Sequence, residues 1–334
     1  MTRTAAAALA LATLNGAMCA VQGVGPAQTN AQTGPCLYWP YSAEESAAQL
    51  KSVGIRRICV PPDRVDAWKS AGFETTSVQF GARVRLQVPG VTAKAQLLSA
   101  TRTPWVDANG WRFIRNPAAE YAYEVPAGKA ALAVAEAFAY GVNALLHVDP
   151  KDLQDAGPML AFVAQVPPSD LPNIADFGFV DDGSDIAAEV MKLLVRRNLL
   201  FARVDAPASR FKLNVVLGAE GYSREDALDN PSAFAQRVRS QLTDGQRSLR
   251  VYGTEVVIGR LTASATRARL HLLNYGGREL EGLRIRVRGR FGEGTLHVPT
   301  GRSKLVDHAV IEGATEFSIP RMTAYAVVDL REVR

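Results

Sequence analysis

The spacing of apolar positions predicts helices alternating with strands over the first half of the chain. Ser42 and Glu45 have the spacing of a capping box, ahead of a helical apolar pattern that ends at Gly54. The further elements expected are a strand at 56–62, a short helix at 63–73, a strand at 83–90, an Ala-rich helix at 127–140 and a strand at 143–150. This alternation predicts a mostly parallel sheet covered by helices.

A second α/β group is expected after the prolines at 167, 168 and 172, which mark a domain boundary. Asn230 and Pro231 form the start signal of a helix, with asparagine as the cap and proline at the first helical position. The elements expected are strands at 176–184, 199–205 and 212–218 and helices at 185–198 and 231–242.

From about residue 248 the pattern changes to short strands separated by turn residues. In residues 283–288 apolar side chains alternate strictly with Arg284, Arg286 and Arg288. One face is therefore buried and the other wet, which predicts half of an antiparallel sandwich. We expect the arginine face to be solvated and not to bind a polyanion, because arginine covers exposed sheet surface well.

The N-terminus has the pattern of a secretory signal: Arg3, an apolar run over 5–14 and small residues at 17–20. The run is too short to span a bilayer, so we expect export to the periplasm or the extracellular space without a membrane anchor. The predicted organisation is a signal peptide (1–20), a disordered leader (21–35), an α/β domain (36–170), a second α/β domain (171–247) and a β-sandwich (248–334).

Cys36 and Cys59 are the only cysteines left after cleavage of such a signal. An oxidising compartment allows them to form a disulfide. The alternative is two unpaired thiols, with Cys59 inside the buried strand. We slightly favour the disulfide.

Composition excludes several classes of function. The 334 residues carry a formal net charge of +5, and the basic residues are dispersed among 33 acidic ones, so we expect no nucleic-acid partner. There is no nucleophile elbow, Walker loop or metal-binding motif, and the four histidines are scattered. We expect no cofactor and no metal, and the pattern specifies no oligomeric state.

Carboxylates are then the remaining catalytic candidates: Asp107, Glu136, Asp149 and Asp181. Asp149 and Asp181 each follow a predicted strand, where the residues of a parallel sheet line a ligand crevice. The alternative is that they cap the helices that come next, for which both sequences are suitable.

Residues 103–117 contain two tryptophans without helical or strand periodicity, which predicts a loop. Trp105, Asn109, Trp111 and Arg112 are the flat aromatic and polar side chains that suit a sugar, so this loop is a candidate saccharide-binding cleft. The alternative is a buried cluster that roofs a core.

The C-terminal segments "VVIGRL", "ARLHLLNY" and "AYAVVDL" resemble the closing β-sandwich of multidomain glycoside hydrolases. The preceding "EVMKLLVRRNLLF" and "KLNVVLG" are similar to the amidotransferase-like (flavodoxin-like) middle domain of β-galactosidase-like hydrolases. The resemblance implies a (β/α) barrel ahead of these domains, with a pair of catalytic carboxylates. Such a barrel needs roughly 200 residues, whereas 36–170 offers about 135, so a shortened barrel is expected and no catalytic residue is carried over.

Two hypotheses about function follow. The first is an exported glycoside-hydrolase-like protein that acts on or binds a saccharide through a cleft lined by carboxylates and tryptophans. The second is a non-catalytic carbohydrate-binding or scaffold protein derived from such an enzyme. A catalytic pair of carboxylates about 5 to 9 Å apart would distinguish them.

Overall fold

The first sheet is parallel, and the first strand of the chain pairs in its middle with a strand that comes late in the segment. The computed structural model describes residues 34–92 and 105–332. Four strands pair in the order β1 (Pro35–Leu37), β8 (Ala144–Val148), β7 (Tyr121–Val125) and β4 (Val84–Arg85). A parallel bridge between Tyr38 and Cys59 joins β1 to the pair β2 (Arg57–Val60) and β3 (Glu74–Ser77). The strands therefore run in the order β3-β2-β1-β8-β7-β4.

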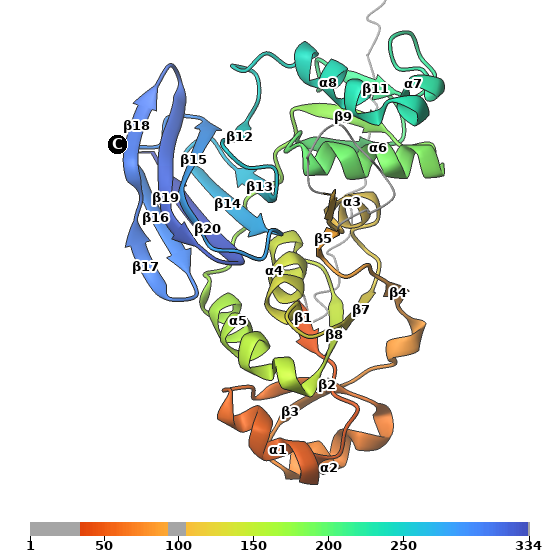
Figure 1. Ribbon diagram of the computed structural model, residues 1–334, viewed down its shortest axis with the longest axis vertical. Coiled ribbons are helices and arrows are strands. Elements are labelled where there is room, and N and C mark those ends of the chain that lie inside the picture. Colours follow the sequence, from red (N-terminus) through yellow and green to blue (C-terminus); the bar gives the residue numbers. More distant parts are fainter. Residues whose placement is uncertain (1–33, 93–104, 333–334) are drawn as a thin grey trace, which may run out of the picture. The chain divides into compact units, whose positions relative to one another are not determined.

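Helices cover one face of this sheet. They are α1 (Ala43–Ser52), α2 (Val65–Ser70), α4 (Ala130–Tyr140) and α5 (Leu153–Gln165), with short 3-10 turns at η1 (Pro62–Arg64), η2 (Phe80–Ala82) and η3 (Pro150–Asp152). Figure 1 shows α4 and α5 beside β1, β7 and β8. Alternate strand residues such as Leu37, Tyr123 and Leu146 are buried beneath these helices.

Local signals explain where these helices begin and end. The Ser42 hydroxyl accepts a hydrogen bond from the Glu45 amide, which confirms the predicted cap of α1. Gly141 ends α4 in the left-handed conformation with φ 64°, which glycine adopts without steric cost. At the other end of α4, the Asp152 carboxylate accepts hydrogen bonds from the amides of residues 128–130.

The tryptophan-rich segment is not a loop, so that expectation is wrong. Trp105–Asp107 forms strand β6, which pairs with β5 (Gly90–Thr92), and Gly110–Arg115 forms helix α3. The helix forms because Trp111 and Phe113 turn inward into the core around it. The expected strand at 83–90 is also shorter, since only Val84 and Arg85 pair.

The middle segment has the elements expected from its pattern and one further short helix, α7, that was not predicted. Strands β9 (Phe177–Val180), β10 (Phe201–Val204) and β11 (Asn214–Val216) form a parallel sheet in the order β10-β9-β11. They are accompanied by α6 (Asp185–Arg196), α7 (Arg224–Asp229) and α8 (Pro231–Gln241). The Asn230 side chain caps α8 by accepting from the Ala233 amide, as the sequence predicts.

The C-terminal segment consists of two antiparallel sheets that face each other (Figure 1). One sheet contains β12 (Leu249–Val251), β15 (Leu280–Arg288), β19 (Ala314–Met322) and β18 (Val306–Ile311). The other contains β13 (Val257–Ala263), β14 (Arg267–Asn274), β20 (Tyr325–Arg331), β16 (Glu293–Val298) and β17 (Gly301–Lys304). Leu283, Ile285 and Val287 point into the core between the sheets, as their alternation predicts.

The two larger apolar clusters join different segments of the chain. One apolar cluster contains residues of both α/β segments, together with Tyr275 and Tyr325, and a second fills the sandwich. The described residues, 34–92 and 105–332, belong to one compact unit. The predicted signal peptide and residues 21–33 of the predicted leader lie outside the described residues, whereas Pro35, the last residue assigned to the leader, begins β1. No helix in the described parts of the chain is long and apolar enough to cross a membrane.

Candidate functional site

The face of the first sheet that points away from the helices has two levels of side chains. Because strand residues alternate, every second residue of β1, β7 and β8 points to this inner face. The lower level is apolar, and consists of Cys36, Ala122 and Leu145, with Cys59 and Phe80 packed beside them. The upper level, nearer the carboxyl ends of the strands, carries polar side chains.

The carboxylate of Glu124 lies at the centre of the upper level, between a cationic side chain, Arg85, and an ionisable one, His147. Glu124 of β7 accepts a hydrogen bond from Arg85 of β4 at 2.6 Å, and its other carboxylate oxygen lies 2.8 Å from Nδ1 of His147 in β8. Glu124 and His147 are register partners in the parallel ladder. The Glu124 side chain is 58 % exposed and is therefore accessible to a ligand, whereas the His147 side chain is 28 % exposed and its Nε2 is buried.

Aromatic rings surround this group. Tyr38, just past β1, stacks on Phe80 with ring centroids 4.6 Å apart and meets the His147 ring edge-on at 5.8 Å. Tyr41 follows the same strand, lies 6.1 Å from the His147 ring and is exposed. The Arg85 guanidinium lies 4.4 Å from the Phe80 ring centroid.

The surroundings shift two pKa values at this face. Burial acts to raise the pKa of Glu124, but hydrogen bonds and charge from Arg85 and His147 prevail and lower it. The pKa of Tyr38 is raised by burial and by the negative charges of Asp63 and Glu124. At neutral pH the face therefore presents an ionised carboxylate beside the neutral phenol of Tyr38.

A disulfide fixes the strands beneath the polar group. Cys36 of β1 and Cys59 of β2 are bonded, with a Cα–Cα distance of 6.0 Å. The two cysteines therefore pair, as the slightly favoured of the two alternatives predicts. This bond cross-links the strand that carries Tyr38 to its neighbour.

The sequence candidate Glu136 belongs to a different environment. It has no exposed surface. Its oxygens accept hydrogen bonds from the Asn109 amide at 2.7 Å, the Asn109 side chain at 2.9 Å, and the hydroxyls of Tyr123 and Tyr275 at 2.6 Å each. Burial raises its pKa, and these donors offset the shift only in part. The geometry favours a structural role that joins α3, α4, β7 and the turn after β14.

The structure does not bring Asp149 and Asp181 to a shared edge. Asp149 follows β8 of the first sheet, whereas Asp181 follows β9 of the middle sheet. The Asp149 carboxylate accepts from the Lys151 amide and caps η3, so its capping alternative holds. Asp181 is 8 % exposed and binds Arg115 through two hydrogen bonds of 2.9 Å.

The remaining candidates lie around α3. Asp107 accepts from the indole of Trp105 at 3.0 Å and from the Thr92 hydroxyl, and lies 3.7 Å from the Lys192 ammonium. The half-buried Trp105 ring packs under cationic side chains of α6. Asn109 is completely buried.

Trp111 and Arg112 form a stacked pair on α3. Trp111 is 7 % exposed, and the Arg112 guanidinium lies 4.3 Å from its ring. Most side chains of this segment form a buried cluster, which was the alternative to a saccharide-binding cleft. Their role in saccharide binding stays an untested prediction.

Sequence reasoning missed Tyr38, Arg85, Glu124 and His147 as a group. The available signal was the polar residue near the end of an apolar strand: Glu124 in "YAYEV" and His147 in "ALLHV". A parallel strand covered by helices is nearly all apolar, so a charged residue there indicates a site at the carboxyl edge. Among residues 34–92 and 105–332, no group of His, Cys, Asp or Glu side chains is placed to hold a metal ion.

No family model and no curated protein matches the sequence. Among solved structures, the α-L-fucosidase isoenzyme 2 from Paenibacillus thiaminolyticus aligns over 67% of this chain and 62% of its own, with a TM-score of 0.52 and 9% identity. A GH42 β-galactosidase from G. stearothermophilus aligns over 74% of this chain and 53% of its own, with a TM-score of 0.36 and 7% identity. The chain thus spans less than two thirds of either protein, and the likeness to the fucosidase shows a glycoside-hydrolase-like fold.

Proposed function

We propose that the protein binds a saccharide at the inner face of its first sheet, around Glu124. The observation that carries this proposal is an exposed, ionised carboxylate held between Arg85 and His147 beside accessible aromatic rings. The carboxylate and guanidinium suit sugar hydroxyls, and the rings of Tyr38 and Tyr41 suit the C–H faces of a sugar.

The proposal includes a shortened (β/α) barrel as the frame of the site. Its support is the order β3-β2-β1-β8-β7-β4, in which the last strand of the series pairs with the first. A closed (β/α) barrel has this cyclic order, and its ligands bind at the carboxyl ends of the strands. The Glu124 group lies at those ends. The amidotransferase-like assignment of the middle segment rests on sequence resemblance and its three parallel strands.

Binding without hydrolysis is the function that the pKa values favour. The lowered pKa of Glu124 suits a nucleophile or an electrostatic partner, but a general acid needs a raised pKa. In the described ranges, the carboxyls with raised pKa are Glu136 and Asp176, and both are occupied by hydrogen bonds elsewhere. Hydrolysis is the second candidate. Asp63 supports it as a second carboxylate near this face, because its negative charge raises the pKa of Tyr38 together with that of Glu124.

Export to an oxidising compartment is part of the proposal. The disulfide between Cys36 and Cys59 supports it, because such bonds persist mainly outside the cytosol. Mass spectrometry of the mature protein, isolated from periplasm or medium, would identify its N-terminus. Recovery of a chain that still begins at Met1 in the cytoplasm would contradict this part.

The test is titration of the full chain with a panel of oligosaccharides, starting with fucosylated ones because the fucosidase shares the fold. We expect Glu124→Gln and Tyr41→Ala each to weaken binding about tenfold or more, since each removes a direct contact. Glu120→Gln, at an exposed position just before β7, is the matched control and should bind normally. Equal affinity of Glu124→Gln and the wild type would refute the site.

Release of sugar from aryl fucosides or from the oligosaccharide that binds best distinguishes the second candidate. Turnover that Glu124→Gln and Asp63→Asn both abolish would establish hydrolysis. Binding without turnover supports the non-catalytic function.

A further inference from the structure

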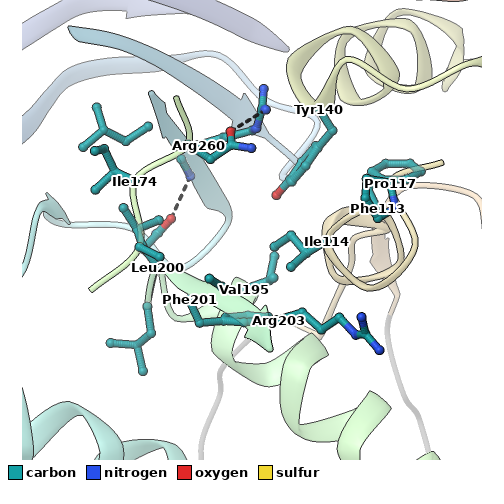
Figure 2. A pocket seen from close by; sticks show the side chains of 17 residues that line it. Phe113, Ile114, Pro117, Tyr140, Ile174, Val195, Leu200, Phe201, Arg203 and Arg260 are labelled. Atoms are coloured by element: carbon teal, nitrogen blue, oxygen red, sulfur yellow. Dashed lines mark hydrogen bonds between the residues drawn. The ribbon is translucent and has the colours of Figure 1, made fainter. Parts of the chain in front are cut away.

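A cavity of about 250 Å³ lies where α3, the end of α4, β10 and β13 meet. Its walls are mostly apolar and come from all three segments of the chain, with Ile114, Val195, Phe201 and Leu261 among them. Figure 2 shows these walls around a central space. The cavity shares no residue with the Glu124 group.

Arg260 places a positive charge at the edge of this apolar cavity, without an acidic partner among the described residues. Its guanidinium donates hydrogen bonds to the carbonyl oxygen of Ala139 and to Oδ1 of Asn173 at 2.5 Å, and both acceptors are neutral. No carboxylate in the described parts of the chain lies within ion-pair distance of it. An arginine has five N–H donors, so donors remain for a ligand. Burial lowers the pKa of Arg260, which reflects a charge without compensation.

Tyr140 supplies a second polar group. Its ring lies 5.5 Å from the Arg260 guanidinium, and Figure 2 shows its hydroxyl pointing into the cavity. This hydroxyl makes no hydrogen bond with any residue that the structure describes. It passes close to the backbone of α3 at Gly110, where a Cβ would lie 2.1 Å from the oxygen. The glycine therefore allows the phenol to reach its position.

The other cation at the cavity is already neutralised. Arg203 lies 3.5 Å from Asp181 and 2.7 Å from Asp205. Figure 2 shows its guanidinium directed away from the central space. Arg260 and Tyr140 are thus the groups available to an anion.

The size of the cavity limits the ligand. An apolar cavity of about 150 Å³ accommodates a benzene ring, so this one has room for one ring or a branched alkyl group together with a short acidic chain. A carboxylate can accept a charge-assisted hydrogen bond from Arg260 and a second from Tyr140. The apolar part then contacts Ile114, Val195 and Phe201.

We propose that this cavity is a binding site for a small aromatic or branched aliphatic carboxylate, anchored by Arg260 and Tyr140. The site is independent of the saccharide site. The site suits a small effector molecule, or the apolar acid part of a larger conjugate. The proposal does not depend on the saccharide proposal and stands even if that one fails.

Calorimetric titration of the full chain with 3-phenylpropionate tests the proposal, with 3-phenylpropionamide as the neutral counterpart. We expect saturable one-site binding of the acid and at least tenfold weaker binding of the amide. Tyr140→Phe removes only a hydroxyl that has no hydrogen-bond partner in the described ranges, so it should fold normally and weaken binding of the acid about tenfold. Arg260→Gln should abolish binding.

Two controls separate this site from other causes. Arg267→Gln removes an exposed arginine of β14 that pairs with Asp170, and should leave binding unchanged. Glu124→Gln should also bind the acid normally. Absence of saturable binding at millimolar concentrations, equal affinity for acid and amide, or full affinity in Tyr140→Phe would overturn the proposal, even if Arg260→Gln fails to fold.

Discussion

Glu136 and Glu124 are both glutamates held by several donors, but their environments differ in kind. Glu136 is enclosed, and its partners are two phenols and both nitrogen donors of Asn109, all of them neutral. Glu124 is mostly exposed, and its partners are Arg85 and His147. The same type of side chain therefore stabilises the fold at position 136 and remains available to a ligand at position 124.

The difference teaches that the accessibility of a carboxylate, and not the number of its hydrogen bonds, separates a structural role from a chemical one. A buried carboxylate that accepts from four donors has little capacity left for substrate. An exposed one can exchange a partner for a ligand hydroxyl at small cost, because water already competes for it.

The largest expected effect is at Glu136. Glu136→Ala leaves four buried donors without an acceptor, and we expect unfolding free energy to fall by about 3 to 5 kcal/mol. Helix propensity does not contribute to the loss, because alanine favours helices. Denaturant unfolding of Glu136→Ala, with Glu189→Ala on the exposed side of α6 as the control, measures it. A loss below about 1 kcal/mol would show that Glu136 is not structural.

The disulfide below Glu124 should have the next largest effect. Replacing Cys36 and Cys59 by alanine removes a cross-link between residues 23 positions apart, which should lower stability by about 3 kcal/mol. A reductant should destabilise the wild type by a similar amount and leave the double variant unaffected. Equal sensitivity of both proteins to the reductant would contradict the assignment.

The pH dependence of stability should have opposite sign for the two glutamates. The pKa of Glu136 is raised in the folded protein, so its contribution is complete below the ordinary value of 4.5 and is lost as pH rises through the raised value. The pKa of Glu124 is lowered, so its contribution is complete above 4.5 and is lost as pH falls through the lowered value.

Unfolding free energies of Glu136→Gln and Glu124→Gln against pH measure these signs. Relative to Glu136→Gln, the wild type should lose stability as pH rises above about 4.5. Relative to Glu124→Gln it should lose a smaller amount as pH falls below about 4.5, because Glu124 is exposed. The same sign for both variants would remove the distinction between the two environments.

Local signals in the sequence predicted much of the fold. The cap at Ser42, the helix end at Gly141 and the Asn230–Pro231 start are short-range patterns, and the structure contains each of them. The alternation over 283–288 placed the correct side chains in the sandwich core. These features depend on neighbours within a few residues, so sequence alone is sufficient for them.

The candidate site could not be predicted in the same way, because its members come from distant parts of the chain. Arg85, Glu124 and His147 meet only once β4, β7 and β8 are paired in register. Trp111 was assigned to a loop because its neighbours lack periodicity, whereas tertiary burial makes them a helix. Glu136 was a candidate because sequence does not show that Tyr275, 139 residues later, closes over it.

The smallest expected effect tests whether an arginine-bound glutamate makes a ligand site where no pair of aromatic rings like that beside Glu124 is stacked next to it in the described residues. Glu316 pairs with Arg284 and, at 3.6 Å, with Arg286 on the outer face of the sandwich, while Arg288 donates to the Gln246 carbonyl.

Changing the three arginines to glutamine should alter stability by about 1 kcal/mol, because Arg284 and Arg288 are exposed and the partly buried pair of Arg286 and Glu316 is long, at 3.6 Å. Affinity for saccharide should not change, because in the described parts of the chain no stacked pair of rings like Tyr38 and Phe80 lies beside these arginines. Heparin affinity should decrease only because the net charge is lower. A control variant in which three exposed arginines elsewhere on the surface are replaced should therefore lose the same proportion of its affinity. A sharp loss of heparin binding specific to this triple variant would make the arginine face a polyanion site, and a carboxylate bound by arginines would then mark a ligand surface even without aromatic rings.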